Sequence, residues 1–442
     1  MKPLILLFFP LALAAQKNYP LLIDNYLKAR TNVLGFSGSV LVASHGKVIF
    51  KKAYGLADKE WNVPNTIDTR FAIGSMTKQL TAGCIMLLQE KGKLSVNDKL
   101  SKYFPDYPKA DSVTIHMLLN HTSGMHDLSS DSDFLDKYAF DTRSIETLFT
   151  AQKKLGYDFS PGTDWAYCNA GYFLLGLIIE KTSGMSYEQF LQQNILDPLG
   201  MTNTKVDYRD SIVAKRAHGY YRDNNSVVNS RHFSPYTTYS AGEMLSTVED
   251  MYKWATALKT EKLLSAASKK QMMTAYKGKY GYGFFVDSLM QHPQVAHGGG
   301  DFAFLSNLAM YPQDDLNIII MTNTGYSDPW TTTNAVALMM FGRDIELPYI
   351  HNPITLDPSL LDKFTGTYEA GTLTIQVIKK DDKLYRHREG TEDISMTPES
   401  LHKFFYDDGS DRQIDFLADR SGKIVKVRLV ESGMGVGLKR VN

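Results

Sequence analysis

The sequence predicts an α+β domain followed by a small antiparallel β domain. Three observations support this fold class. Strand-like runs lie near both ends of the first 345 residues, with helical patterns between them, which is typical of a sheet that joins the two termini of one domain. The stretch IELPYIHNPITLDPSL then carries three prolines and no periodicity, so residues 346–357 are predicted to be a linker. Beyond it, residues 358–442 change to short alternating strands, a pattern that favours a sandwich or barrel.

Composition limits the classes of partner. The chain has 442 residues and 43% apolar content, enough for a large core and more than one domain. Its 48 basic and 48 acidic residues balance, and no long run of one sign appears, so nucleic acid is not an expected partner. We expect a small-molecule or short-peptide substrate. The sequence carries no signal for the oligomeric state.

The N-terminus has the pattern of a secretory signal peptide. Residues 1–15 contain one basic residue, an apolar stretch from Leu4 to Leu13, and the small-x-small site Ala12-Leu13-Ala14. This stretch is too short to span a bilayer stably, and no later segment approaches eighteen uninterrupted apolar residues. We therefore expect an exported protein, periplasmic or extracellular, without stable membrane insertion. A buried N-terminal strand is the less favoured alternative.

Only two cysteines, Cys84 and Cys168, are present. A chain of this length does not need a disulfide for stability, so we expect two partly buried free thiols, although an exported protein can also bridge them. Their separation does not match a metal-binding spacing. We expect neither a metal nor a cofactor.

The elements of the first domain can be followed in order. GFSGSVLVASHGKVIFKKAYG predicts a hairpin around the turn Ser44-His45-Gly46. A buried helix follows, and then a loop-rich passage with one short helix. NAGYFLLGLIIEKTSGMSYEQFLQQNILDPLGM predicts two helices separated by a glycine break. STVEDMYKWATAL has a helix-start pattern, with Ser246 or Thr247 as N-cap and acidic residues in the first turn.

Three strand-like runs and a closing helix complete this domain. The runs are YGYGFFV, FAFLSNLAMYP and LNIIIMTNTG, and NAVALMMFGRDI predicts the helix. In the C-terminal part, Leu373, Ile375 and Val377 alternate with polar residues in one segment. Val425, Val427 and Leu429 do so in another. Turns such as KKDDK and DRSGK separate these short strands, and together they predict the small antiparallel domain.

The helix in FAIGSMTKQLTAGCIMLLQEKG contains an unfavourable residue. It is apolar on nearly every side and should be buried, yet Lys78 shares a face with Ser75 and Ala82. A buried lysine is costly unless it is paired or loses its proton. A serine hydroxyl needs a base to become a nucleophile, and a desolvated lysine has a lowered pKa. Ser75-x-x-Lys78 is therefore predicted to be a nucleophile with its base.

The same S-x-x-K spacing occurs twice more, in unsuitable places. Ser44…Lys47 lies in the hairpin turn, and Ser400…Lys403 has no apolar helix behind it. The sequence contains no G-x-S-x-G elbow and no H-E-x-x-H pair. Three histidines between residues 116 and 126 are interpreted as structural residues rather than metal ligands: His116, His121 and His126.

WAYCNAGY places a phenol and an amide two residues apart, at Tyr167 and Asn169. In an extended segment, residues two apart can point the same way. Both side chains can then enter one cleft, with Cys168 facing elsewhere. Taken alone, the cluster also fits a buried turn.

VAHGGGDFAF contains His297 followed by Gly298, Gly299 and Gly300, at the predicted start of a strand. Glycines let a ligand lie close to the strand and leave N–H groups available as donors. Taken alone, this cluster also fits a plain tight turn.

Together and in this order, the three clusters resemble the motif set of the penicillin-recognising serine hydrolases: Ser75-x-x-Lys78, Tyr167-x-Asn169 and His297-Gly298-Gly299. The branch that the sequence resembles contains class C β-lactamases, D-alanyl-D-alanine carboxypeptidases, D-aminopeptidases and related esterases. LLNHTSGM, YSAGEMLSTVEDM and ILDPLGM are similar to further family stretches. The resemblance implies a β-lactamase/transpeptidase-like domain over residues 16–345, with an antiparallel sheet flanked by helices and an all-helical part. LDKFTGTYE, in the tail, is similar to the lipocalin-like barrel of some relatives.

The resemblance also implies a role for each residue. Ser75 would attack the carbonyl and become acylated, while Lys78 and Tyr167 share the general-base work and Tyr167 protonates the leaving group. Asn169 would hold the substrate amide and orient Lys78. The N–H groups of Ser75 and Gly300 would form the oxyanion hole, typically the largest stabilising contribution in acyl transfer. The remaining substrate-binding positions are His297, Gly298 and Gly299.

The third motif departs from the usual pattern. Penicillin-binding enzymes and most β-lactamases have K-T-G or K-S-G there, with a lysine that meets a substrate carboxylate. A histidine, with an ordinary pKa of about 6.5, is mostly neutral at pH 7. We therefore expect weak carboxylate anchoring at His297, and neither efficient β-lactamase nor strict carboxypeptidase activity. H-G-G is similar to the motif of D-aminopeptidases and some esterases.

We expect a secreted serine hydrolase that cleaves amide or ester bonds through an acyl-enzyme, with D-amino-acid peptides or cell-wall fragments as substrates. An esterase or weak β-lactamase on the same machinery is the first alternative. A second is a non-catalytic binding protein on a retired hydrolase scaffold, which is disfavoured because Ser75, Lys78 and Tyr167 are all present. A third is that the C-terminal barrel carries the biological role by binding a ligand or partner.

Overall fold

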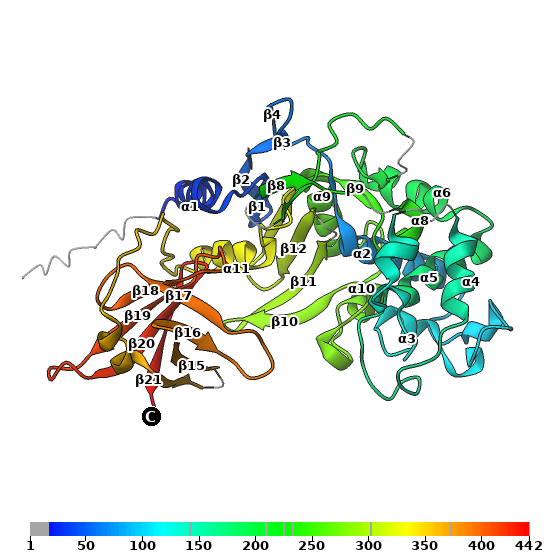
Figure 1. The fold of residues 1–442 in the computed structure, drawn as a ribbon. Coiled ribbons are helices and arrows are strands. Elements are labelled where there is room, and N and C mark those ends of the chain that lie inside the picture. Colours follow the sequence, from blue (N-terminus) through cyan, green and yellow to red (C-terminus); the bar gives the residue numbers. More distant parts are fainter. Residues whose placement is uncertain are drawn as a thin grey trace, which may run out of the picture.

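The chain forms an α+β part with a central sheet and a helical half, followed by a closed β-barrel (Figure 1). This is the predicted fold class, and the small C-terminal domain is a barrel rather than a sandwich. None of the helices in the described part of the chain has the length and apolar content needed to cross a bilayer. The predicted signal peptide, residues 1–15, lies outside the described residues. The computed structural model describes residues 17–140, 144–207, 211–223, 226–231, 234–300, 303–371 and 373–441.

The central sheet is antiparallel and has the strand order β10-β11-β12-β13-β1-β2. Its strands come from both ends of the α+β part, as predicted. β1 lies beside β13 with Val40 opposite Ile320, so the sheet joins segments about 280 residues apart. The strands are β1 (Gly38–Ser44), β2 (Lys47–Tyr54), β10 (Phe285–Leu289), β11 (His292–Gly300), β12 (Leu305–Tyr311) and β13 (Leu316–Thr322).

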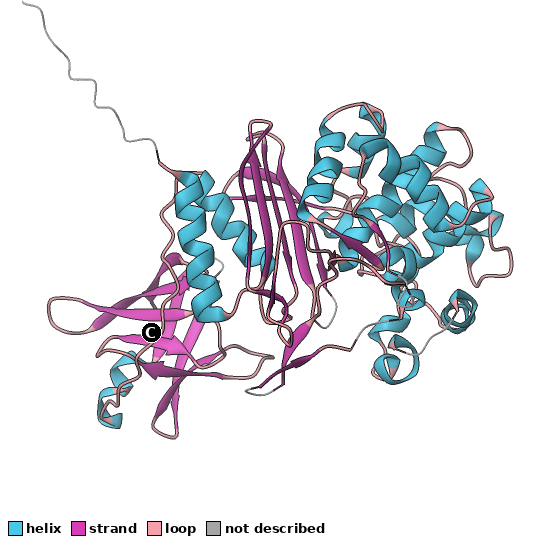
Figure 2. Ribbon diagram, turned by 90° about the horizontal axis from the view of Figure 1, so that it is seen from above, coloured by secondary structure: helices cyan, strands magenta, loops and turns pink. Residues whose placement is uncertain are grey.

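Helices cover both faces of this sheet (Figure 2). Helices α1 (Tyr19–Leu34) and α11 (Pro329–Met340) pack on one face, over a cluster that includes Val40 and Ile320. Helix α9 (Val248–Lys259) and the helical half cover the other face. Because side chains alternate along a strand, neighbouring residues of β1 and β13 belong to two separate cores.

The helical half surrounds α2, which is the buried helix that the sequence predicts. Every residue from Thr77 to Leu88 is buried. Gly83 lets Trp254 of α9 approach so closely that an added Cβ would lie 2.9 Å from the indole ring. The helices of this half are α2 (Thr77–Glu90), α3 (Ile115–Leu119), α4 (Ile145–Lys153), α5 (Asn169–Ser183), α6 (Tyr187–Leu191), α7 (Asp197–Leu199), α8 (Pro235–Thr238) and α10 (Ala266–Met272).

Local sequence signals explain several helix ends. Thr247, one of the two predicted N-caps, accepts a hydrogen bond from the Asp250 N–H and begins α9. The predicted glycine break is Gly184, which ends α5 with a φ of +73°. Ser186 then begins α6 through a capping box with Gln189. These three signals are short-range, so they can be recognised in the sequence.

Three predicted elements differ from the structure. YGYGFFV was expected to be a strand, but β10 begins only at Phe285, because Gly283 takes a φ of +76° against the backbone of α2. The sequence predicts His297 at the start of a strand, whereas the residue lies near the end of β11. The closing helix begins earlier than expected, at Pro329, with Asp328 as its N-cap.

The barrel is closed by pairing of its first and last strands, β14 and β21. Phe364 and inward-facing side chains such as Tyr368, Phe404 and Phe416 fill its core. The strands are β14 (Gly366–Ala370), β15 (Leu373–Lys380), β16 (Lys383–His387), β17 (Ile394–Pro398), β18 (Lys403–Tyr406), β19 (Gln413–Ala418), β20 (Ile424–Glu431) and β21 (Met434–Arg440).

A β-bulge changes the expected alternation in β20. The pairing with β19 skips Val425, since Leu417 is opposite Lys426 and Ala418 is opposite Ile424. Val425 is consequently exposed, whereas Val427 is fully buried. Alternating sequence alone does not reveal such an inserted residue.

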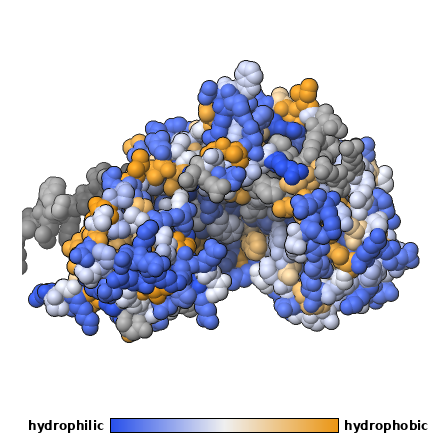
Figure 3. All heavy atoms as spheres, viewed as in Figure 1, coloured by the Kyte–Doolittle hydropathy of each residue, from blue (hydrophilic) through white to orange (hydrophobic). Residues whose placement is uncertain are grey.

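The barrel contacts the α+β part near α1. The buried Arg30 guanidinium hydrogen-bonds the Asp411 carboxylate at 3.4 Å. Arg428 forms an ion pair with Glu346, and the Glu346 N–H donates to the Gly433 carbonyl at 3.0 Å. On the face shown in Figure 3, hydrophilic side chains dominate and hydrophobic ones are scattered among them.

Candidate active site

A short turn holds Ser75 just before helix α2. Strand β5 (Phe71–Ala72) pairs with β9 (Met244–Ser246), and the chain then turns through a 3-10 helix at Gly74–Met76. Gly74 has a φ of +50°, a conformation that favours glycine. Ser75 therefore lies two residues before α2 rather than at the first residue of that helix, and its side chain remains partly exposed.

Lys78 is fully buried and is surrounded by three oxygen atoms. Its Nζ lies 3.0 Å from Ser75 Oγ, 2.7 Å from Asn169 Oδ1 and 2.8 Å from the Ala241 carbonyl oxygen. Burial lowers the pKa of Lys78 to about 7, because a charged ammonium is disfavoured away from water. The lysine can therefore hold or release a proton near neutral pH.

Tyr167 lies on the other side of Ser75. Its phenol is hydrogen-bonded to the Ser75 hydroxyl, and its ring centroid lies 4.9 Å from Lys78 Nζ. Burial raises the pKa of Tyr167 well above its ordinary value, and the bond to Ser75 offsets this only in part. The phenol is consequently protonated at neutral pH and available as a proton donor.

Asn169 begins helix α5 and is held from behind by two residues. Its N–H donates to Asp127 Oδ2 at 2.6 Å, and its Nδ2 donates to Ser129 Oγ at 3.0 Å. These bonds fix the amide so that Oδ1 faces Lys78. The Cys168 thiol points away from the site, towards the Met125 carbonyl at 3.6 Å.

The third oxygen around Lys78 comes from a strained segment. Ala241 follows Tyr239, which has a φ of +42°, a costly conformation for a bulky residue. The Tyr239 hydroxyl donates to Glu180 Oε1 at 2.7 Å, which anchors the segment to α5. This anchor keeps the Ala241 carbonyl directed at Lys78.

His297 lies behind the site and faces Tyr280. Its Nδ1 donates to the Gly298 carbonyl at 2.5 Å, and its Nε2 accepts a hydrogen bond from the Tyr280 hydroxyl at 2.8 Å. Burial lowers the pKa of His297 to about 3, with the nearby Lys78 adding to this effect. The imidazole is therefore neutral, with both nitrogens occupied.

The end of β11 lies directly against the Ser75 turn. A Cβ on Gly299 would lie 1.8 Å from the Ile73 carbonyl oxygen, and a Cβ on Gly74 would lie 2.5 Å from the Gly300 nitrogen. Only glycine permits this approach. Gly298 is different, because a Cβ there meets nothing closer than 3.4 Å.

Ser75, Asn169 and Gly300 line a cavity of about 240 Å³. Its charged lining residues are Asp127 and Glu243, and the described residues that line it include no lysine, arginine or histidine. The apolar side of the cavity is formed by Leu128, Phe134, Leu135, Leu148 and Phe173.

The structure thus brings Ser75, Lys78, Tyr167 and Asn169 into one hydrogen-bonded group. Gly299 and Gly300 lie against it, and His297 supports it from behind. Four supporting residues could not be identified from the sequence: Asp127, Ser129, Ala241 and Tyr280. The family-like stretch YSAGEM contains Ala241, but its role depends on a contact with a helix 163 residues away.

Cys84 and Cys168 are buried free thiols, as expected, and do not bridge. The three histidines make structural contacts. His116 Nδ1 lies 2.6 Å from the Tyr282 hydroxyl, His121 accepts from the Cys168 N–H, and His126 lies between Asp131 and Asp158.

The two central glycines of the third motif should respond differently to an added methyl group. Gly299→Ala forces the Ile73 carbonyl away and should slow labelling of Ser75 by a fluorophosphonate probe at least about a hundredfold. Gly298→Ala is the matched control and should remain within about threefold of the wild type, because the added methyl group makes only ordinary van der Waals contacts. Equal labelling rates for the two variants, with both folded by circular dichroism, would contradict this account of the turn.

Comparisons with known proteins agree with this arrangement. The chain is 29% identical to penicillin-binding protein 4* of Bacillus subtilis over 405 residues, which cover 84% of this chain and 88% of the relative. It is 28% identical to the teichoic acid D-alanine hydrolase of Staphylococcus aureus over 306 residues, 68% of this chain and 72% of the relative. The octameric penicillin-binding protein homologue from Pyrococcus abyssi superimposes with a TM-score of 0.70 at 25% identity, covering 94% of this chain and 99% of that structure.

The family profile described as beta-lactamase matches residues 23–338. This match includes the Ser75 turn, Lys78, Tyr167, Asn169 and the third motif, and it covers most of the chain. The chain therefore belongs to the beta-lactamase family and is a serine hydrolase of that superfamily.

Proposed function

We propose that this enzyme hydrolyses esters or amides of D-amino acids that carry a free amino group, through an acyl-enzyme on Ser75. The observation that carries the proposal is the 3.0 Å contact between Lys78 Nζ and Ser75 Oγ in a buried site. With a pKa of about 7, Lys78 is substantially neutral at physiological pH. A neutral amine at that distance can take the serine proton.

In the proposed reaction, Ser75 Oγ attacks the carbonyl carbon as its proton passes to Lys78. The N–H groups of Ser75 and Gly300 stabilise the oxyanion. The bond to the leaving group then breaks as Tyr167 gives that group a proton, and the proton on Lys78 restores the phenol. Water attacks the acyl-enzyme with the same base, which releases the acid and regenerates Ser75.

The charges that line the cavity support the substrate class. Asp127 and Glu243 face a space whose described lining contains no cationic side chain, so a protonated amine is favoured and a carboxylate is disfavoured. His297 is neutral and turned towards Tyr280, so it cannot replace the lysine that binds a carboxylate in penicillin-binding enzymes. The teichoic acid D-alanine hydrolase among the relatives supports a D-aminoacyl substrate whose amine is protonated.

We also propose export of the protein, on the pattern of residues 1–15 described above. A cell-wall polymer or a peptide derived from it is reached only outside the cytoplasm. Export and the proposed substrate class are therefore consistent with each other.

Acylation can be tested by intact-mass spectrometry after brief exposure to p-nitrophenyl acetate. The wild type should gain one acetyl group that decays with time, and Ser75→Ala should lose both the adduct and about 10⁴-fold or more of turnover. Ser44→Ala is the matched control, because Ser44 belongs to an S-x-x-K sequence on the hairpin and should keep the adduct. A folded wild type without any adduct would refute the proposal and favour a binding role.

The pH dependence should follow the proton on Lys78. Because only the neutral amine accepts the serine proton, kcat/KM should fall about tenfold per pH unit below pH 7 and level off above it. His297 does not produce this limb, since its pKa is about 3. His126 is a second titrating group, since hydrogen bonds to Asp131 and Asp158 raise its pKa. His126→Asn is therefore the control and should keep the fall in kcat/KM below pH 7. A flat profile between pH 5 and 9 would exclude Lys78 as the base.

Substrate charge should control the rate. A D-alanyl ester with a free amine should react at least about tenfold faster than its N-acetyl counterpart, because the ammonium lies near two carboxylates. Glu243→Gln should reduce this preference, and Glu249→Gln, at a surface ion pair with Lys51, should not. Penicillin, whose carboxylate meets no cation, should acylate Ser75 slowly. If the N-acetyl ester reacts faster while Ser75 is still acylated, the proposed preference for an ammonium group is disproved and the proposed acyl-enzyme is not.

A further inference from the structure

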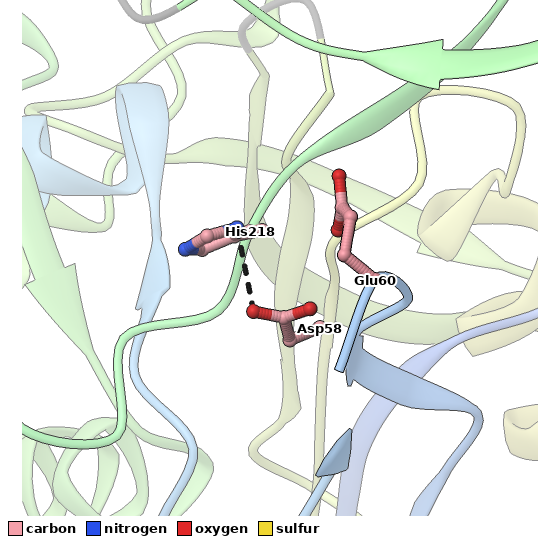
Figure 4. Close-up of side chains that lie close together, drawn as sticks. All are labelled: Asp58, Glu60 and His218. Atoms are coloured by element: carbon pink, nitrogen blue, oxygen red, sulfur yellow. Dashed lines mark ion pairs between the residues drawn. The ribbon is translucent and has the colours of Figure 1, made fainter. Parts of the chain in front are cut away.

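Three side chains of metal-binding type meet at the surface, outside the cavity that holds Ser75. They are Asp58, Glu60 and His218, and their ligand atoms all lie within 4.8 Å of one another. Asp58 is the last residue of β3 (Leu56–Asp58), and Glu60 follows in the turn to β4 (Val63–Pro64). Figure 4 shows the His218 ring facing the Asp58 carboxylate, with Glu60 beside them.

The backbone fixes the relative position of these residues, although His218 follows the two carboxylates by 158 or more positions in the chain. The His218 N–H donates to the Ala57 carbonyl at 2.8 Å. The Trp61 N–H donates to Asp58 Oδ1 at 2.8 Å, which holds this carboxylate in the turn. The cluster is therefore part of the fold rather than a chance meeting of long side chains.

Two further residues orient the Glu60 carboxylate. The hydroxyl of Tyr220, in β7 (Tyr220–Asp223), donates to Glu60 Oε2 at 2.6 Å, and the Asn229 amide donates to Oε1. Neutral donors of this kind commonly hold the carboxylates of metal sites. His218 Nδ1 lies 3.6 Å from Asp58 Oδ2, which is too long for a hydrogen bond.

The charges of the cluster are not balanced by a neighbouring base. Among the described residues, no lysine or arginine forms an ion pair with Asp58 or Glu60. The Lys59 ammonium instead lies over the Tyr220 ring, 5.4 Å from its centroid. Two carboxylates this close repel each other unless a cation lies between them.

A second group of one histidine and two carboxylates shows why this geometry is distinctive. His126 also contacts two aspartates, but Asp131 binds Nε2 and Asp158 binds Nδ1, each at 2.8 Å. The imidazole therefore lies between the two carboxylates, and all its ligand positions are occupied. In the surface cluster, by contrast, one ligand atom from each of Asp58, Glu60 and His218 lies within 4.8 Å of the other two, so one ion can contact all three.

We propose that Asp58, Glu60 and His218 bind a divalent transition-metal ion, with Zn²⁺ the preferred ion. Imidazole and carboxylate are typical zinc ligands, and three protein ligands leave one tetrahedral position for solvent. Ca²⁺ requires six or more oxygen ligands and is disfavoured here. Ligands on a tetrahedral zinc ion lie about 3.4 Å apart, so the exposed Glu60 and His218 side chains must close in slightly. A cavity of about 300 Å³ at these residues gives them room to do so.

The bound ion would cross-link β3 to the segment that leads to His218. That segment runs beside the strand before Ser75, because the Arg70 N–H donates to the Lys215 carbonyl at 2.8 Å and the Ala217 N–H donates to the Arg70 carbonyl at 3.0 Å. Zinc should therefore stabilise the two segments that pair just before the Ser75 turn, without taking part in acyl transfer.

The site can be tested on the full chain after treatment with a chelator. Titration with ZnCl₂ in a calorimeter should give one ion per chain, and the melting temperature should rise by several degrees at saturation. His218→Ala and Glu60→Gln should weaken binding at least about tenfold. Tyr220→Phe, which removes the bond to Glu60 and the bond from the Lys59 N–H, should weaken it about tenfold. His126→Ala is the matched control and should bind Zn²⁺ as the wild type does.

CaCl₂ and MgCl₂ at the same concentrations should not raise the melting temperature. The proposal would be overturned by an absence of zinc binding in the folded wild type, or by equal zinc affinity in His218→Ala. A larger stabilisation by Ca²⁺ than by Zn²⁺ would also overturn it. Hydrolysis of p-nitrophenyl acetate by His218→Ala should remain close to the wild-type rate, so the result is independent of the proposed acyl-enzyme.

Discussion

The burial of Lys78 is the constraint on which the rest of the active site depends. A primary amine without access to water needs hydrogen-bond partners, and Lys78 has three, from three separate segments. The Ser75 turn, the start of α5 and the strained segment before Ala241 must therefore all be in place together. Their supports lie further out, at Asp127 and Ser129 behind Asn169, and at Glu180 below Tyr239. A defect in any of these segments leaves the amine with an unsatisfied contact.

The same region explains why the glycines of the third motif occupy those positions. Gly299 and Gly300 let the end of β11 touch the turn that carries Ser75. The sheet and the helical half meet at this contact, so the serine is held by both. His297 and Tyr280 fill the space behind it with a neutral, hydrogen-bonded pair. The site is consequently rich in oxygen atoms and backbone N–H groups, and the Lys78 amine is buried beneath Ser75.

Much of this could be predicted from the sequence where the signal is local. The opening hairpin, the buried helix α2, the cap at Thr247 and the motif residues around Ser75 all have short-range patterns. The features that could not be predicted share a different cause. Gly283 leaves the strand because it packs against α2, Val425 is skipped by a bulge set by its partner strand, and Asp127 meets Asn169 across 42 residues. Such contacts depend on tertiary packing, which periodicity does not encode.

The pairing of β1 with β13 has a consequence for how the chain folds. Val40 and Ile320 are neighbours in the sheet but are 280 residues apart in the chain. At roughly 5 to 20 residues per second, a ribosome needs on the order of 15 to 60 s to make the intervening segment. During that interval the opening hairpin presents an apolar edge without its partner, which is the kind of surface that aggregates. The opening strands therefore need protection until β13 has been synthesised.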